Sequence, residues 1–330
     1  MLMKSLESGR CAINRISLYG LLLVVSILMA VNSGYACEKA QGESVNSVYF
    51  PPKFDSIDPE NDYVFQLLEL VLEKSQDKFG KCQARLLDYK LPLKRVELYL
   101  EKNAAIQVAA FTVSVKRDER FLPVPVPISK GLMGYRLLMI KQGDAEHFAN
   151  IQTLNDLSAY TAGQGIGWAD ADILKRNGLP VITAGSIKTL IDMLAHSRFD
   201  YFPRGALQII TELETYREKP VQIEQSLALS YPSMTAFYVN ANNTALAERL
   251  EYGLNQAVSD GSFDRFFYQH PSSIDALKNI NLAQRKILKI CNPILPTWVP
   301  IEKHEYWLEP WPQRCLDQAE LKRKRSKELR

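Results

Sequence analysis

The chain has 330 residues, of which 46% are hydrophobic and 23% charged, and its formal net charge is +3. This is ordinary globular composition, with enough length for one large or two modest cores. Residues 322–330 carry six positive charges and one negative charge, so the rest of the chain is close to neutral and does not suggest a nucleic-acid binder. We interpret this basic tail as a helix end, with a role at an anionic membrane surface as the alternative.

The first segment of the chain has the pattern of a secretory signal peptide. Three basic residues precede an apolar run over 18–31, and small residues lead up to Ala36. The apolar run is short for a membrane span with such flanks. We therefore expect cleavage of residues 1–36 and a periplasmic protein. An uncleaved membrane anchor and a lipid-anchored start at Cys37 are the alternatives.

Four of the five cysteines remain after that cleavage. An even number in an exported chain indicates two disulfides, and of the three pairings Cys37 with Cys82 and Cys291 with Cys315 close the shortest loops. No two cysteines have the spacing of zinc ligands, and the four histidines are scattered singly. We expect no metal site and no cofactor.

Strand-like and helix-like segments alternate along the mature chain. Segment 44–50 alternates in the period of a strand, whereas 62–80 repeats apolar residues at three and four, as a helix does. Strand-like runs follow at RVELYL (95–100), IQVAAFTV and GYRLLMI (134–140). The next segments are predicted as helix, strand, helix, strand, helix and strand: TLNDLSAY, YTAGQGIG, ADADILKRNG, LPVITAG, SIKTLIDMLAHS and RFDYF. A long amphipathic helix covers 243–261, and the alternation argues for parallel sheets covered by helices.

Four motifs stand in a characteristic order. FTVSVKR (111–117) has the spacing T-x-S-x-x-R, and TLNDLSAYTAGQGIGWADADIL follows it. The other two are SIKTLIDMLAHSRFDYF and ERLEYGLNQAVSDGSFDRFF. In this order they resemble the extracytoplasmic solute-binding proteins of the type II periplasmic-binding fold, the class that includes polar amino-acid receptors of ABC importers. The resemblance covers roughly 44–272.

The resemblance implies an α/β fold of two lobes, each a mostly parallel sheet flanked by helices, with a ligand trapped between them. Lobe one is expected over 38–130 plus 232–310, and lobe two over 131–231. Residues 311–330 form the basic tail. The chain crosses between the lobes near VPVPIS and ALSYPS.

The first expected ligand contacts lie in lobe one. Arg117 offers a planar fork of donors that fits a carboxylate, and Thr112 and Ser114 add hydroxyl donors at the spacing with which the family holds a ligand carboxylate. The alternative for Arg117, which stands inside KRDER, is a solvated charge or an ion pair on a helix face.

Lobe two is expected to add a glycine loop and its neighbours. Gly165 and Gly167 let backbone approach a ligand closely, and a plain turn is the alternative. The spacing is GxGxG rather than GxGxxG, so a dinucleotide site is not expected. Trp168 is expected to stack on part of the ligand, or else to be a core residue. Asp170 is expected to pair with a ligand amine, or else to cap a helix.

The stretch RFDYFPRG supplies the last candidates. Tyr201 and Phe202 alternate faces in a strand, so one of them faces the cleft, and we select Tyr201. Arg204 stands near the place where amino-acid receptors of this class carry an amine-binding carboxylate. Together with Arg117 it would suit a ligand with two anionic ends, while a buried salt bridge that braces the hinge is the alternative.

The sequence therefore predicts a binding protein for a small carboxylate-bearing solute, either an amino acid or another organic anion. Its expected partners are that ligand and an ABC-type permease, and a monomer is expected. A sensor that reports the ligand to a membrane partner is the alternative, followed by a lyase on the same fold. No G-x-S-x-G motif and no Cys or His nucleophile arrangement is present, so no catalytic residue is assigned.

Overall fold

The computed structural model describes residue 37 and residues 46–53, 58–206 and 208–328, so the predicted signal peptide lies outside the described residues. The strands are β1 (Asn46–Phe50), β2 (Cys82–Leu86), β3 (Val108–Thr112), β4 (Phe121–Pro123), β5 (Tyr135–Lys141), β6 (Ala162–Gly165), β7 (Val181–Ala184), β8 (Tyr201–Gly205), β9 (Val221–Ser230), β10 (Thr235–Asn240) and β11 (Lys286–Lys289). The helices are α2 (Tyr63–Lys74), α3 (Gln76–Phe79), α4 (Leu93–Glu101), α5 (Val115–Asp118), α6 (Ala145–Ala149), α7 (Leu154–Leu157), α8 (Ala169–Arg176), α9 (Ile187–Ala195), α10 (Ile209–Thr215), α11 (Thr244–Ser259), α12 (Ser262–Gln269), α13 (Pro271–Ile280) and α14 (Gln313–Glu328), with the short turns η1 (Leu132–Gly134) and η2 (His304–Tyr306).

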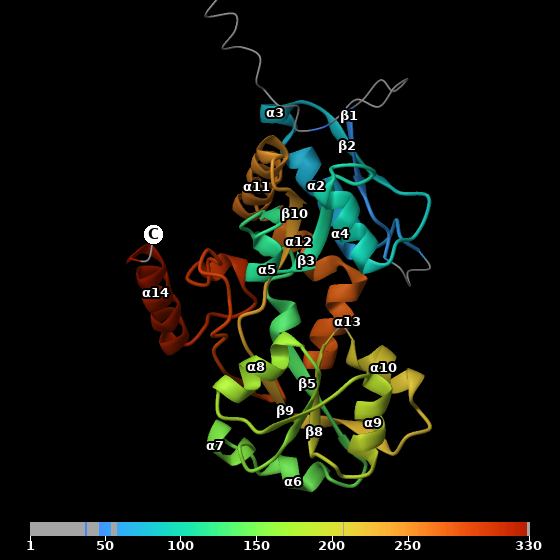
Figure 1. The fold of residues 1–330 in the computed structure, drawn as a ribbon, viewed down its shortest axis with the longest axis vertical. Helices are drawn as coiled ribbons and strands as arrows, with labels where there is room; N and C mark the ends of the chain where they lie inside the picture. The colour runs from blue at the N-terminus through green and yellow to red at the C-terminus, as the bar shows by residue number, and fades with distance from the viewer. Residues whose placement is uncertain (1–36, 38–45, 54–57, 207, 329–330) are drawn as a thin grey trace, which may run out of the picture. The chain divides into compact units, whose positions relative to one another are not determined.

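The strands form separate sheets in two lobes, and helices flank both sets (Figure 1). Lobe one holds the pair β1-β2 and the three-stranded sheet β3-β10-β4. Lobe two holds the six-stranded sheet β11-β9-β5-β8-β6-β7. Its central strand β5 reads YRLLMIK and is buried on both faces, which explains its continuous apolar run. The predicted α/β fold in two lobes is confirmed.

The sheets differ from the expected ones in strand direction. In lobe two, β5 runs antiparallel to both its neighbours, while β11-β9, β8-β6 and β6-β7 are parallel. In lobe one, β10 returns from lobe two and lies antiparallel between β3 and β4, so only β1-β2 is parallel there. In addition, β11 lies within 232–310, the range expected in lobe one, but it pairs with β9 of lobe two.

One predicted strand is wrong. RVELYL (95–100) lies in helix α4, whose buried residues are Val96 and Leu100. These two positions are four apart and lie on one helical face. The alternation within RVELYL resembles that of a strand, but a helix forms because its one apolar face packs against β3 and β10 of lobe one.

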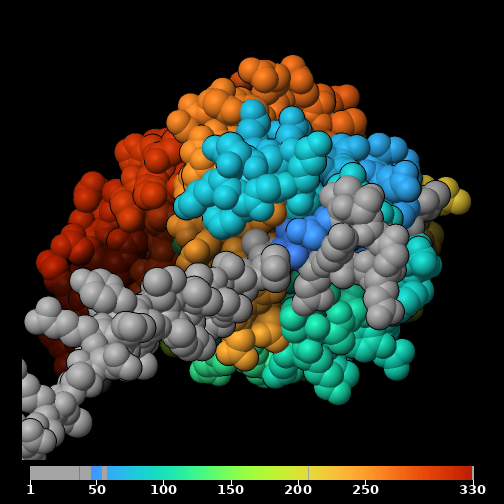
Figure 2. Space-filling model, turned by 90° about the horizontal axis from the view of Figure 1, so that it is seen from above, coloured from blue at the N-terminus to red at the C-terminus, as the bar shows by residue number. Residues whose placement is uncertain are grey.

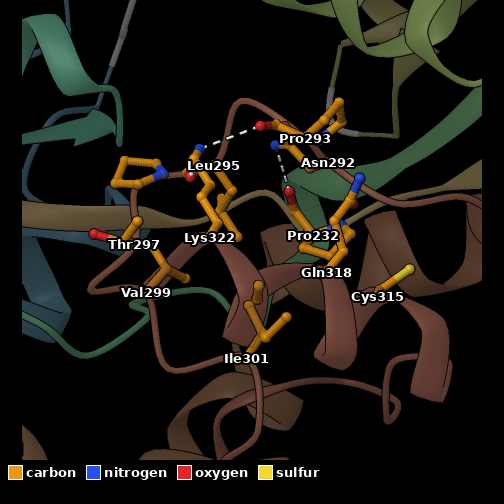
Figure 3. A pocket seen from close by; sticks show the side chains of 12 residues that line it. Pro232, Asn292, Pro293, Leu295, Thr297, Val299, Ile301, Cys315, Gln318 and Lys322 are labelled. Atoms are coloured by element: carbon orange, nitrogen blue, oxygen red, sulfur yellow. Dashed lines mark hydrogen bonds between the residues drawn. The ribbon is translucent and has the colours of Figure 1, made fainter. Parts of the chain in front are cut away.

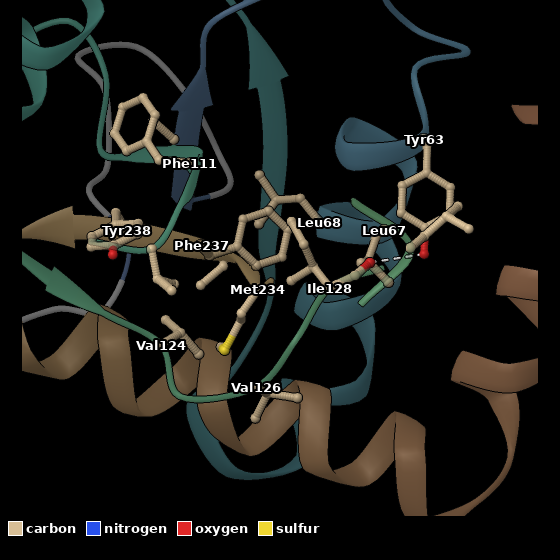
Figure 4. Packing of buried hydrophobic residues seen from close by; sticks show 14 of the residues in the cluster. Tyr63, Leu67, Leu68, Phe111, Val124, Val126, Ile128, Met234, Phe237 and Tyr238 are labelled. Atoms are coloured by element: carbon tan, nitrogen blue, oxygen red, sulfur yellow. Dashed lines mark hydrogen bonds between the residues drawn. The ribbon is translucent and has the colours of Figure 1, made fainter. Parts of the chain in front are cut away.

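Lobe one is held by an aromatic and aliphatic core (Figure 4). Side chains from α2, from β3 and β10, and from the first crossing segment point into it. Helices α2 and α11 pack against each other, and in the space-filling view the cyan residues near the end of α2 lie beside the orange residues of α11 (Figure 2). Their backbones approach closely at Gly253, where a Cβ would stand 2.2 Å from the carbonyl oxygen of Val71. Only glycine fits this contact.

Both expected disulfides are present, Cys37–Cys82 and Cys291–Cys315. The second one attaches α14, which forms most of the expected basic tail. Lys322 donates to the carbonyl oxygens of Pro293 and Leu295, at 3.2 and 2.6 Å, and Figure 3 shows this side chain crossing a small pocket beside Asn292. Lys322 of the tail therefore binds backbone carbonyls of the preceding loop.

We expect that replacing both Cys291 and Cys315 with alanine lowers the free energy of unfolding by about 3 kcal/mol, because the disulfide closes a loop in the unfolded chain. The two cysteines are 24 residues apart in sequence. Urea unfolding of the double variant against the oxidised parent measures the change. A loss below about 1 kcal/mol would show that the carbonyl contacts of α14 hold this region without the disulfide.

Candidate functional site

A cavity of about 710 Å³ lies where lobe one, the first crossing segment and lobe two meet. This volume lies in the range of small-molecule sites, about 300–1,000 Å³. Its polar wall consists of hydroxyl, amide and charged side chains: Lys53, Tyr63, Thr112, Ser129, Thr211, Thr235, Ser272, Ser273, Asp275, Lys278 and Asn279. Its apolar wall consists of Val64, Ala110, Ile128, Leu132, Met133, Ala206, Ile210 and Ala276. The mixture suits a small solute with polar and apolar parts.

Helix α13 contributes the largest share of charged groups to this cavity. Asp275 and Lys278 both line it, and neither has an ion-pair partner among the described residues. Lys53 also lines it but pairs with Asp62 at 2.7 Å. The hydroxyl oxygen of Ser129, in the first crossing segment, is buried and has no hydrogen-bond partner within the described part of the chain. The wall therefore has uncommitted polar groups of both charge signs.

The expected carboxylate contacts of lobe one meet this cavity at one residue, Thr112. Ser114 instead caps α5, where its hydroxyl oxygen accepts from the backbone N–H of Arg117 at 3.3 Å. Arg117 donates to the carbonyl oxygen of Thr112 at 2.9 Å and lies 3.4 Å from a carboxylate oxygen of Glu97. Its guanidinium also lies over the ring of Phe111. The arginine is thus paired within its own lobe, as the ion-pair alternative expected.

A second group of predicted residues lies at the carboxyl ends of the strands in lobe two. Arg204 forms a two-pronged ion pair with Glu212 of α10, and its side chain is 8% exposed. The guanidinium carbon stands 4.7 Å from the ring centre of Trp168 and 4.9 Å from that of Phe202. Because planar stacking and two hydrogen bonds both hold Arg204, its charge is already neutralised in the protein.

Asp170 takes part in a partly buried network with Arg136 of β5 and with Tyr231 of the second crossing segment. It pairs with Arg136 of β5 at 2.8 Å and accepts from the hydroxyl of Tyr231, which follows β9. The Arg136 Nε donates to the same hydroxyl at 2.6 Å. Burial raises the pKa of Tyr231 above its usual range, so the phenol stays protonated and its O–H donates a hydrogen bond to Asp170. The cap position of α8 belongs to Trp168, not to Asp170.

The glycine loop, its tryptophan and Tyr201 are the remaining candidate residues. The ring of Trp168 covers Gly165, where a Cβ would lie 2.2 Å from the indole. Gly167 has φ of 76°, so this turn requires glycine. Tyr201 is fully buried in the core of lobe two and packs edge-on against Phe148. Arg204 and the stacked aromatics lie on the opposite face of β8, and the ligand contact of Tyr201 stays a prediction.

The structure therefore brings together Gly165, Trp168 and Arg204 in one cluster, and Asp170 beside it. Within the described residues, Thr112 is the one predicted contact on the cavity wall. Sequence analysis missed the contribution of α13. Its cavity residues recur at three and four, as on any amphipathic helix, and no local signal indicates that this helix meets lobe two.

We expect the stability of the protein to fall as the pH falls below the usual histidine range because of His270. This residue caps α13, and its Nδ1 accepts from the backbone N–H of Ser272 at 3.2 Å. Burial lowers the pKa of His270 below 6.5. The unfolded chain therefore takes up the proton at a higher pH than the folded one, so this contribution is present above pH 6.5 and is lost as the pH falls through the folded pKa.

Urea unfolding between pH 7 and pH 5 checks this expectation. His270→Asn keeps a capping acceptor but does not titrate. We expect a smaller loss of stability on acidification for that variant than for the parent. Equal losses would contradict the assignment to His270.

The described residues contain no group of three or more His, Cys, Asp or Glu side chains that could hold a metal ion. Nor do they contain a helix that is long and apolar enough to cross a membrane.

No family model matches this chain, and no curated protein matches it. Several solved structures resemble it at low identity. The probable amino-acid ABC transporter extracellular-binding protein from Bacillus subtilis is 13% identical, with a TM-score of 0.49, over 70% of this chain and 99% of that one. The L-cystine solute receptor of Neisseria gonorrhoeae in the unliganded open conformation is 16% identical, with a TM-score of 0.45, over 68% of this chain and 92% of that one. An ancestral arginine-binding protein bound to arginine is 14% identical, with a TM-score of 0.44, over 68% of this chain and 98% of that one.

Proposed function

We propose that this protein is an extracytoplasmic solute-binding protein, which holds a small carboxylate-bearing solute between two lobes and delivers it to an ABC-type importer. One observation carries the proposal: a cavity of about 710 Å³ whose wall is shared by lobe one, the first crossing segment, lobe two and α13. A solute in such a place contacts both lobes at once, so it stabilises their closed arrangement.

The pairing of the arginines changes how a carboxylate would be held. Arg117 and Arg204 are occupied by Glu97 and Glu212. Lys278 has no carboxylate partner in the described residues and lines the cavity. We therefore assign the ligand carboxylate to Lys278, with the hydroxyl of Thr112 as a neighbouring donor on the cavity wall.

A thermal-shift screen of residues 37–330 against amino acids, dicarboxylates, other organic anions and neutral sugars tests the proposal. A ligand at one hundred times its Kd stabilises the folded state by about 2.7 kcal/mol. We expect a carboxylate-bearing compound to raise Tm and to be recovered chemically unchanged. Neutral sugars alone raising Tm would overturn the carboxylate assignment, and conversion of the compound would overturn binding without chemistry.

Lys278→Gln is expected to weaken binding of that compound about fivefold, the effect of one exposed charge pair. The matched control is Lys175→Gln, which removes an exposed cation on α8 away from the cavity wall. Calorimetric titration measures both. Equal affinities for the two variants would remove Lys278 from the site and leave the cavity itself to be tested separately.

A further inference from the structure

The C-terminal segment from Cys291 to Cys315 begins and ends on lobe two. The residue before it continues the sheet, since the backbone N–H of Ile290 donates to the carbonyl oxygen of Ser230 at 2.8 Å. Asn177, at the end of α8, donates to the carbonyl oxygen of Cys291 at 2.8 Å. The disulfide then joins the two ends of the segment. Both ends are therefore fixed beside β11.

The middle of the same segment is bound to lobe one. The Trp298 Nε1 donates to the carboxylate of Asp118 in α5 at 2.8 Å. The hydroxyl of Tyr306 donates to the side-chain oxygen of Asn255 in α11 at 2.6 Å. Asp118 is partly buried and also accepts from the hydroxyl of Tyr238 at 2.8 Å. Burial raises the pKa of Asp118, while the bonds from Trp298 and Tyr238 oppose that rise. A charged acceptor away from water makes these hydrogen bonds stronger than average.

The C-terminal segment also binds the end of the first crossing segment, at Lys130. The Lys130 side chain is 5% exposed, and its ammonium donates to the carbonyl oxygen of Glu305 at 2.9 Å. Its own carbonyl oxygen accepts from the backbone N–H of Leu308 at 2.8 Å. Trp307 lies against the next residue, Gly131, where a Cβ would stand 2.5 Å from the indole. The crossing is thus held from its backbone and from its side chain.

We propose that residues 291–315 form a strap that restrains the movement of the two lobes, in addition to the two segments that cross between them. The strap is closed by a disulfide on lobe two and hydrogen-bonded to lobe one. Any rotation of one lobe against the other must therefore stretch or break the contacts of Trp298 and Tyr306, or deform the strap. The strap sets how far the empty protein departs from the observed arrangement. This property does not depend on which solute the cavity binds.

The test measures the distance between the lobes in the protein without ligand. Spin labels are attached through non-natural residues at the exposed positions Lys94 of α4 and Glu146 of α6, and pulsed electron resonance gives the distribution of distances. We compare the parent with Trp298→Phe combined with Tyr306→Phe, which removes both donors and leaves an aromatic ring at each position. We expect minor distances outside the parent's main peak to gain population about tenfold.

The control is Tyr252→Phe, which removes a tyrosine hydroxyl that bonds Asp77 inside lobe one. It should reproduce the parent distribution. If the double variant does not fold, the single variant Tyr306→Phe replaces it. For that variant we expect a smaller shift of the distance distribution in the same direction. Distributions of the strap variants that superimpose on those of the parent and of Tyr252→Phe would overturn the proposal, whatever the solute screen finds.

Discussion

Asp170→Ala is expected to lower the free energy of unfolding by about 3–5 kcal/mol, the cost of leaving a buried charge without its partner. The side chain of Arg136 is 10% exposed and has Asp170 as its carboxylate partner at 2.8 Å. Removing the carboxylate leaves the guanidinium with the hydroxyl of Tyr231 as its neighbour.

Asp172→Ala is the matched control for this prediction. Asp172 lies in the same first turn of α8, is exposed and has no ion pair among the described contacts. Its removal costs only the favourable interaction with the helix N-terminus, about 0.3–1 kcal/mol. Urea unfolding at pH 7 measures both variants. Losses within about 1 kcal/mol of each other would contradict the structural role of the Arg136–Asp170 pair.

Gly134→Ala is the second prediction with a large effect, a loss of about 2–3 kcal/mol from overpacking. A Cβ at Gly134 would stand 2.1 Å from the carbonyl oxygen of Tyr231, so η1 and the second crossing segment must separate to admit it. Their backbone hydrogen bond, from the N–H of Tyr231 to the carbonyl oxygen of Gly134 at 3.2 Å, would weaken as well.

Gly185→Ala provides the comparison, because a Cβ there meets nothing within 4 Å. We expect it to change the free energy of unfolding by less than about 0.5 kcal/mol. Thermal and urea unfolding of both variants distinguish contact at the crossing from a general effect of replacing glycine. A Gly134→Ala variant as stable as Gly185→Ala would show that η1 does not pack against the second crossing segment as described.

Sequence periodicity was sufficient for the fold class because most elements carry one strong period. The run of β5 and the spacing of α11 are examples, and both elements occur where the pattern predicts them. RVELYL failed because its apolar residues fit both periods over so short a stretch, and burial of Val96 and Leu100 decides for a helix.

The chemistry of the candidate site was harder to predict because partners come from distant parts of the chain. Arg117 looks free in the sequence, yet Glu97 from α4 reaches it. Arg204 meets Glu212 one helix later, and Asp170 meets Arg136, which precedes it by 34 positions and lies on a central strand. Charge alone therefore identifies a cluster, and only the fold decides whether its members bind each other or a ligand.

The contacts of the strap could not be predicted from the sequence for a similar reason. The proline- and tryptophan-rich stretch from 292 to 315 has no helical or strand period. Its cysteines predicted a closed loop, and that disulfide is confirmed. Its docking on Asp118 and Asn255 depends on tertiary contacts that no local pattern encodes.

The most direct test of the solute-binding account is native mass spectrometry of residues 37–330 incubated with a bacterial metabolite extract. The comparison uses Thr211→Trp, which fills the cavity from α10, and Thr215→Trp, which places the same ring one turn further along the helix and off the cavity wall. The account predicts one small-molecule adduct on the parent and on Thr215→Trp, and none on Thr211→Trp. No adduct on the parent, or equal adducts on both variants, would contradict a solute site in this cavity.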